Sequence, residues 1–144
     1  MRKQNIAVTV DALLFYKKAD LLKILLIRRK NEPFRNQWAL PGGFLDEDEN
    51  LEEGAKRELE EETGLKIEKL QQVGAFGAPG RDPRGRTVSI AFVGLMNEEA
   101  MPKANDDAVD AKWFAMNDLP DLAFDHSEII NAGSVFVIGN CKAR

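Results

Sequence analysis

The sequence is poor in the residues that build disulfide frameworks and zinc sites. It contains one cysteine, Cys141, and one histidine, His126, among 144 residues. A single cysteine allows no internal disulfide, which fits a reducing cytoplasm, and these two side chains cannot supply the four ligands of a structural zinc site. We therefore expect a cytoplasmic protein that depends on neither disulfides nor zinc.

Long apolar runs and an excess of positive charge are also absent. No stretch approaches the roughly 20 apolar residues that cross a bilayer, and the N-terminus has no signal-peptide hydrophobic region. The net charge of −4 and the pI near 5.1 argue against a nucleic-acid or membrane partner. The length and the lack of repeats or low-complexity linkers predict one domain over residues 1–144.

Strand patterns outnumber helix patterns along the chain. The expected strands are residues 6–16, 22–29, 38–40, 67–76, 87–96 and 111–116. The expected helices are residues 50–62 and 127–137, with a helical turn at 118–120. This order predicts a mixed α/β fold of the α+β kind, in which a mixed sheet is flanked by helices.

The helix expected at residues 50–62 has signals at both ends. Asn50 is a suitable N-cap, and Glu53 stands three residues on, as in a capping box. Gly64 is placed for the left-handed position that ends a helix. Upstream, Pro41-Gly42-Gly43 predicts a sharp backbone bend.

Negative charge is concentrated around this helix. Between Asp46 and Glu62 the chain has ten acidic and two basic residues, a local charge of −8, which leaves +4 for the rest. An acidic cluster of this kind favours bound cations, and the basic remainder is suited to an anionic substrate.

Three carboxylates of the helix share one face. Glu58, Glu61 and Glu62 lie within an arc of about 100° on a helical wheel. The arc overlaps the apolar stripe of Leu51 and Leu59, whereas a plain acidic amphipathic helix would place its carboxylates opposite that stripe. Half-buried carboxylates repel one another unless a cation compensates, and three hard oxygen ligands favour Mg²⁺ or Mn²⁺.

These residues also carry a family resemblance. Gly43, Glu49 and the run Arg57-Glu58-Leu59-Glu60-Glu61-Glu62-Thr63-Gly64-Leu65 match the fixed positions of the Nudix box. The sequence is therefore similar to the Nudix hydrolases, which implies an α/β/α sandwich with a mixed sheet and a loop-helix-loop. The resemblance also implies Mg²⁺-dependent hydrolysis of a nucleoside diphosphate linked to another moiety.

The resemblance implies roles for particular residues. Glu58, Glu61, Glu62 and the carbonyl of Gly42 match the metal ligands of the family. Arg57 and Glu49 match the pair that orients those ligands, although a surface ion pair is the alternative for Arg57. The general base is left open among Glu61, Glu62 and Asp107, which lies six residues before Trp113. The acidic neighbours of Asp107 are Asp106 and Asp110.

A second loop suggests the substrate. Pro79 stands fifteen residues after Gly64, a spacing that resembles the ADP-ribose pyrophosphatase subgroup. Arg81, Arg84 and Arg86 follow, and arginine offers a planar fork for phosphate oxygens. The alternative is a solvated hairpin loop with incidental charge. Arg28 and its neighbour Arg29, at a strand end, are further candidates to reach the site, with a capped strand end as the alternative.

Aromatic residues near the end of the chain add two candidates. The segment around Phe124 and His126 resembles one in the same subgroup and in the Nudix-like domains of NAD-pathway repressors. Phe124 is suited to stack on a base and His126 to contact ribose or phosphate, but a core position for Phe124 and a helix start at His126 are the alternatives. We expect Trp38 and Trp113 in the core.

The function best supported by these residues is hydrolysis of ADP-ribose to AMP and ribose 5-phosphate. One alternative is a MutT-like nucleoside triphosphate pyrophosphohydrolase, which Pro79 and the arginine loop disfavour. Another is a module that senses ADP-ribose without catalysis, which the intact box disfavours. The repressors with such a module have a C-terminal DNA-binding domain, for which a chain ending at Arg144 leaves no room. The expected partner is a small nucleotide, with a homodimer implied by resemblance.

Overall fold

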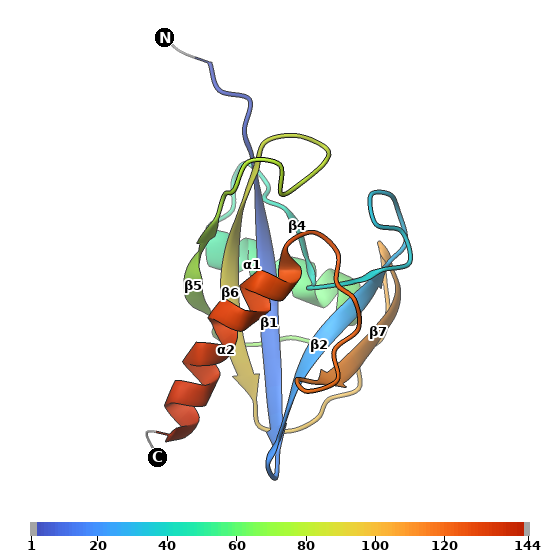
Figure 1. The fold of residues 1–144 in the computed structure, drawn as a ribbon, viewed down its shortest axis with the longest axis vertical. Helices are drawn as coiled ribbons and strands as arrows, with labels where there is room; N and C mark the ends of the chain where they lie inside the picture. The colour runs from blue at the N-terminus through green and yellow to red at the C-terminus, as the bar shows by residue number, and fades with distance from the viewer. Residues whose placement is uncertain (1–2, 143–144) are drawn as a thin grey trace.

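The computed structural model describes residues 3–142, except for the side chains of residues 139–142. Its elements are β1 (Ala7–Lys18), β2 (Leu21–Arg29), β3 (Trp38–Ala39), β4 (Gly42–Phe44), α1 (Leu51–Thr63), β5 (Gln71–Phe76), β6 (Thr87–Met96), β7 (Ala108–Ala115) and α2 (His126–Lys142). The strands form one sheet in the order β3-β2-β1-β6-β5, with β4 paired to β1 and β7 paired to β2 (Figure 1).

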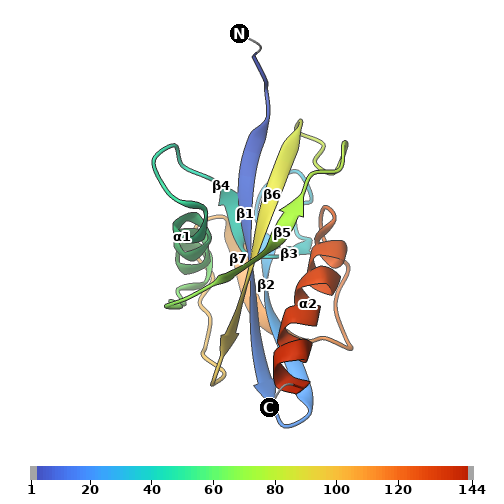
Figure 2. The same ribbon diagram turned by 90° about the vertical axis from the view of Figure 1, so that its left-hand side faces the viewer.

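The sheet is mixed and is covered on both faces. β1 runs parallel to β6, whereas its pairings with β2 and β4 are antiparallel. β4 pairs with the first part of β1, and β2 pairs with the last part. Figure 2 shows α1 on one side of the sheet and α2 on the other. The predicted α/β/α sandwich is therefore confirmed.

The central strand β1 is buried on both faces, which fixes the two helices. Leu13 and Phe15 belong to the core cluster that contains Ile129 of α2. Leu14, on the opposite face, packs in a cluster with Leu59 of α1. Successive side chains of a strand point to opposite faces, so this apolar run anchors both layers. The apolar stripe of α1 therefore lies on the sheet, and its carboxylates lie at the edge of that contact.

Most expected elements occur, with differences at their ends. The strand expected at 67–76 begins only at Gln71, because the Leu70 N–H donates to the Glu52 carboxylate of α1, at 3.0 Å, rather than to a sheet partner. The helical turn expected at 118–120 is wrong. The Asp118 N–H donates to the Ala115 carbonyl in a tight turn after β7. β4 was not expected, since three residues with two glycines carry no strand periodicity.

The predicted helix ends are half right. Gly64 has φ of 73° and its N–H donates to the Glu60 carbonyl, so the left-handed C-terminal position is confirmed. Asn50 is the N-cap, but its side chain donates to the Glu53 carboxylate at 2.9 Å and makes no cap bond to the backbone, so the capping box is wrong. α2 extends beyond the predicted 127–137. A Cβ at Gly133 would stand 2.4 Å from Leu13, so glycine permits the close contact of α2 with β1.

Both tryptophans serve packing, as expected. Trp38 meets Phe114 edge-on at 4.8 Å between ring centroids, and the Trp113 indole N–H donates to the Ala100 carbonyl at 2.7 Å. The side chain of Cys141 lies outside the described residues. In the described part of the chain, no helix has the length and apolar character needed to span a membrane.

Candidate active site

Arg57 is the centre of the acidic face of α1. Its guanidinium donates to both carboxylate oxygens of Glu49, at 2.9 and 2.7 Å. The same guanidinium donates to Glu58 at 2.9 Å and to Glu61 at 3.1 Å. The hydrogen bonds with Glu49 hold the pKa of Arg57 above its usual range and the pKa of Glu49 below it. The structure thus joins four residues that the sequence singled out, and Arg57 is not a simple surface ion pair.

Glu62 lies deeper than its neighbours. Only 5% of it is exposed, and one carboxylate oxygen accepts the Gly42 N–H at 2.7 Å. Burial raises the pKa of Glu62 well above the usual carboxyl range. Burial also raises the pKa of Glu58, although the Arg57 hydrogen bond acts in the other direction. These two carboxylates therefore bear a desolvation cost that a nearby cation would relieve.

The two carboxylates open into a hollow of about 400 Å³. Its lining comes from α1, β4, the end of β2 and three loops: Arg29, Asn31, Glu32, Gly42, Gly43, Phe44, Glu58, Glu62, Arg84 and Asp107. Asp107, the expected late acidic residue, thus lies beside the helix carboxylates, and its carboxylate accepts a hydrogen bond from Asn31 at 3.2 Å. Glu61 is not in the lining, and 43% of its side chain is exposed.

Gly43 is required by close approach. A Cβ at this position would stand 2.8 Å from the carboxylate carbon and both oxygens of Glu58. Real Cβ atoms do not come that close, so any side chain at residue 43 would displace the Glu58 carboxylate or the bend. The glycine of the box therefore serves the placement of Glu58.

The donor set fits a magnesium or manganese ion. The lining includes the carboxylates of Glu58, Glu62 and Asp107, and these hard cations prefer oxygen ligands of this kind. Among the side chains that the structure describes, no three from acidic, histidine or cysteine residues stand close enough to enclose an ion by themselves. Magnesium needs no such cage, because it keeps several waters and is held by one or two carboxylates together with substrate phosphates.

The arginine loop differs from the expectation of three free guanidiniums. Only 4% of the Arg81 side chain is exposed, and it donates to both oxygens of Asp125 at 2.9 and 2.6 Å. These bonds hold the pKa of Arg81 above its usual range, although burial opposes the shift. Arg81 is therefore a buried anchor that offers no free fork. Arg86 and Pro79 are exposed and line neither this hollow nor the smaller one beside it.

Arg84 is the loop residue that reaches the hollow. It is paired with Asp82, at 2.8 Å, and its guanidinium lies 4.8 Å from the ring centre of Phe44 and 5.5 Å from that of Phe124. About a third of the Arg84 side chain is open to solvent (38%). The guanidinium is thus held between two aromatic rings at the mouth of the site, where a planar group of a substrate has access to the same surfaces.

The strand-end arginine that lines the hollow is Arg29, not Arg28. A register shift between Arg28 and Arg29 in the pairing of β2 with β7 turns the chain at this point. Arg28 contributes to neither hollow of the site, whereas Arg29 contributes to both. The Arg29 guanidinium lies 5.1 Å from the ring centre of Phe124, and burial lowers its pKa. The candidate Arg28 is corrected to Arg29.

Phe124 and His126 take different places. Phe124 is half-buried with φ of 54°, and its ring packs on Phe34 at 4.6 Å. His126 is 5% exposed, and its Nδ1 accepts the Leu40 N–H at 3.0 Å. Both border a second hollow of about 40 Å³, which is little more than the ~30 Å³ that one water occupies. His126 therefore starts α2 in the core, as the alternative for this residue stated.

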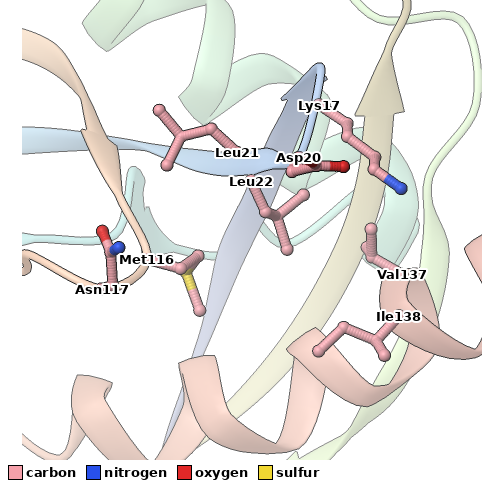
Figure 3. A pocket seen from close by; sticks show the side chains of 8 residues that line it. All are labelled: Lys17, Asp20, Leu21, Leu22, Met116, Asn117, Val137 and Ile138. Carbon is pink, nitrogen blue, oxygen red and sulfur yellow. The ribbon is translucent and has the colours of Figure 1, made fainter.

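A larger hollow of about 440 Å³ lies at the other end of the molecule, beside the β1–β2 turn. Figure 3 shows Leu22, Met116 and Ile138 around it, and its charged lining residues are Lys17 and Asp20. It lacks the converging carboxylates and guanidiniums of the hollow over α1. Although it is the larger of the two, this hollow therefore lacks the groups that a reaction on a phosphate would need.

With the fold and site in view, comparison with known proteins identifies the class. Residues 6–132 match the NUDIX domain. The chain belongs to the NUDIX family.

Three relatives illustrate the range of that family. An ADP-ribose pyrophosphatase of Methanocaldococcus jannaschii is 50% identical over 109 residues, which are 75% of this chain and 63% of the relative. The ADPR responsive transcriptional repressor NtrR of Acinetobacter baylyi is 39% identical over 140 residues, which are 94% of this chain and 55% of the repressor. The chain thus spans about three fifths of the length of these two curated relatives.

The third relative is a solved structure, the NUDIX domain of Shewanella oneidensis NrtR complexed with ADP ribose. It is 35% identical and superposes with a TM-score of 0.86, covering 94% of this chain and 90% of that domain.

Proposed function

We propose that this chain hydrolyses ADP-ribose to AMP and ribose 5-phosphate with Mg²⁺, for which Mn²⁺ can substitute. The observation that carries the proposal is the placement of Glu58, Glu62 and Asp107 around the same hollow as Arg29 and Arg84. A diphosphate needs cationic contacts for its oxygens and a group that accepts the proton of attacking water. The relative of 50% identity that is named ADP-ribose pyrophosphatase supports the choice of substrate.

The metal would be held by Glu58, Glu61, Glu62 and the carbonyl of Gly42. When bound, it would neutralise charge on the phosphate oxygens and polarise the phosphorus. Arg57 would keep Glu58 and Glu61 in place, since one nitrogen of its guanidinium donates to both carboxylates. Glu61 lies outside the lining of the hollow, so its carboxylate would have to turn toward the ion while it keeps the bond to Arg57.

The rest of the site would bind and orient the substrate. Arg29 and Arg84 are suited to the diphosphate, and the ring of Phe124 between them is suited to stack on a base. A water oxygen would form a bond to one phosphorus while the bond from that phosphorus to the bridging oxygen breaks. The water proton would pass to a carboxylate, for which Asp107, Glu61 and Glu62 are the candidates.

The test is a product assay with ADP-ribose, NADH, diadenosine polyphosphates and dNTPs, each with Mg²⁺ and with EDTA. We expect AMP and ribose 5-phosphate from ADP-ribose, much slower turnover of dNTPs, and no turnover in EDTA. Faster turnover of a dNTP would overturn the substrate assignment in favour of a MutT-like activity. Turnover that persists in EDTA would overturn the metal dependence.

A second candidate function is sensing of ADP-ribose without turnover. It is favoured by the similarity to an ADPR responsive repressor over 94% of this chain. Titration calorimetry in saturating Mg²⁺ separates the two functions. A sensor would give a heat of binding that saturates with ADP-ribose and would release no AMP, whereas an enzyme would release AMP.

We also propose, from the family resemblance and the cysteine content, a homodimer in the cytoplasm. Light scattering that gives the 16.1 kDa mass of one chain would overturn the dimer.

A further inference from the structure

The first residue of α2 is bonded to the segment that leads into the site. His126 Nδ1 accepts the Leu40 N–H at 3.0 Å, a buried contact between residues 86 positions apart. Only a neutral imidazole can accept at Nδ1, and burial lowers the pKa of His126, which favours that form. Nε2 faces Asp11 at 3.8 Å, beyond hydrogen-bond distance. The bond to Leu40 is therefore the specific contact of this side chain.

Leu40 stands two residues before the backbone of the site. Pro41, next in the chain, accepts the Ala12 N–H of β1 at 2.8 Å. Gly42 then donates its N–H to Glu62 at 2.7 Å. A Cβ at Gly42 would stand 2.2 Å from the Val10 carbonyl, so the bend is pressed against β1. Because only Pro41 separates Leu40 from Gly42, a displacement at Leu40 would shift the Gly42 N–H relative to the Glu62 carboxylate.

The residue before His126 is anchored as well. Asp125 receives two hydrogen bonds from Arg81, and the exposed fractions of the two side chains are 16% and 4%. Buried two-point pairs of this kind hold a backbone in one position. The loop around residue 81 thus fixes the start of α2, and the start of α2 holds Leu40.

We propose that His126 is a positioning residue that sets the Gly42 backbone against Glu62, and that the Arg81–Asp125 pair holds His126 for this task. The arginine loop then acts on the reaction through the fold as well as by any contact with substrate. The catalytic readout of this proposal rests on the proposed function, whereas its metal-binding readout does not.

Two amide variants separate the hydrogen bond from the bulk of the side chain. The side-chain amide of Asn reaches about as far as Nδ1 of histidine, and the amide of Gln reaches about as far as Nε2. His126→Asn should therefore keep an acceptor for the Leu40 N–H, and His126→Gln should lose it. The measurements are Mn²⁺ affinity without substrate, followed by electron paramagnetic resonance, then kcat and KM for ADP-ribose, and the melting temperature.

We expect His126→Asn to stay close to wild type. His126→Gln should lower Mn²⁺ affinity and kcat by roughly tenfold, the lower end of the usual cost of losing an outer-shell partner, with KM little changed. Wild-type Mn²⁺ affinity in His126→Gln would overturn the proposal. So would a rise in KM alone, because that result would place His126 on the substrate.

Arg81→Met tests the role of the Arg81–Asp125 pair and leaves His126 in place. It should lower Mn²⁺ affinity in the wild-type background and add little in the His126→Gln background, because both changes act on the same segment. Full additivity, or unchanged Mn²⁺ affinity in Arg81→Met alone, would overturn the coupling. If His126→Gln folds poorly, the Arg81→Met result alone decides the proposal.

The outcomes also separate this inference from the proposed function. Loss of Mn²⁺ affinity in His126→Gln, in a protein that does not cleave ADP-ribose, would support the positioning role and overturn the substrate. Efficient cleavage of ADP-ribose by wild type, with Mn²⁺ affinity unaltered in His126→Gln, would do the reverse.

Discussion

Replacing Arg57 by lysine tests whether the geometry of the guanidinium, rather than its charge, organises the site. The arginine makes four hydrogen bonds to three carboxylates, of Glu49, Glu58 and Glu61, at 2.7 to 3.1 Å. A lysine ammonium is a single point of charge, so it cannot keep both oxygens of Glu49 and also reach α1. Each lost charge-assisted bond is worth about 1.5–3 kcal/mol when buried, and less here because 25% of the arginine side chain is exposed.

We therefore expect kcat of Arg57→Lys to fall by roughly 10- to 100-fold, the usual cost of losing a group that orients metal ligands, with a smaller change in KM. The assay is steady-state AMP release from ADP-ribose at several Mg²⁺ concentrations, with the melting temperature measured in parallel. Lys56→Arg is the matched control, because Lys56 lies on the same helix, forms an ion pair with Glu52 and donates to the Glu68 carbonyl. A change confined to KM would place Arg57 on the substrate and refute the reasoning.

Three further changes test other parts of the site. Glu61→Gln should lower turnover by orders of magnitude with folding preserved, whereas Glu53→Gln on the exposed face should leave turnover unchanged; similar activity of the two variants would remove Glu61 from the ligand set. Because burial raises the pKa of Glu62, its protonated form favours the folded state, and this stability is lost as pH rises from the usual carboxyl pKa through the raised one. In EDTA, the free energy of unfolding measured with urea should therefore fall over that pH range in wild type but not in Glu62→Gln. Parallel pH profiles of the two proteins would contradict a costly buried charge at Glu62. Arg81→Ala should lower the free energy of unfolding by roughly 3 kcal/mol, as expected for breaking a buried ion pair. Arg86→Ala, at an exposed position, should leave stability unchanged by calorimetry. Equal melting temperatures of the two variants would show that the Arg81–Asp125 pair adds no stability.

The arrangement of the carboxylates on α1 could be predicted because it is local. The carboxylates share one helix, whose period places Glu58 and Glu62 on the stripe that packs on the sheet, and burial raises the pKa of both. The end of the helix was equally readable, since Gly64 has the left-handed φ that glycine favours. Asp107 was a weaker prediction, based only on its spacing from Trp113, yet it lines the hollow beside the helix.

The arginines could not be sorted from the sequence, because their partners are distant or their directions depend on register. Arg81 pairs with Asp125, 44 residues away, whereas Arg84 pairs with its near neighbour Asp82, and nothing in the loop sequence distinguishes the two. Arg28 and Arg29 are adjacent on a strand, so a single register shift decides which of them faces the hollow. Arg86, the third arginine of the loop, is exposed. The three loop arginines therefore have three different surroundings, which the composition of the loop does not reveal.

The burial that raises the desolvation cost of the α1 carboxylates also favours a bound cation. Arg57 bonds Glu49, Glu58 and Glu61 but carries only one positive charge, and it makes no bond to Glu62. The buried Glu62 carboxylate is instead balanced by one backbone N–H, which is a partial charge. A divalent ion that reaches both Glu58 and Glu62 would therefore lower the desolvation cost of the folded state. An ion that binds only the folded state adds stability as the ion concentration rises above its Kd. Metal binding, stability and turnover should consequently change together in variants of this helix, whereas changes at Arg29 should alter turnover of substrate without altering metal-dependent stability.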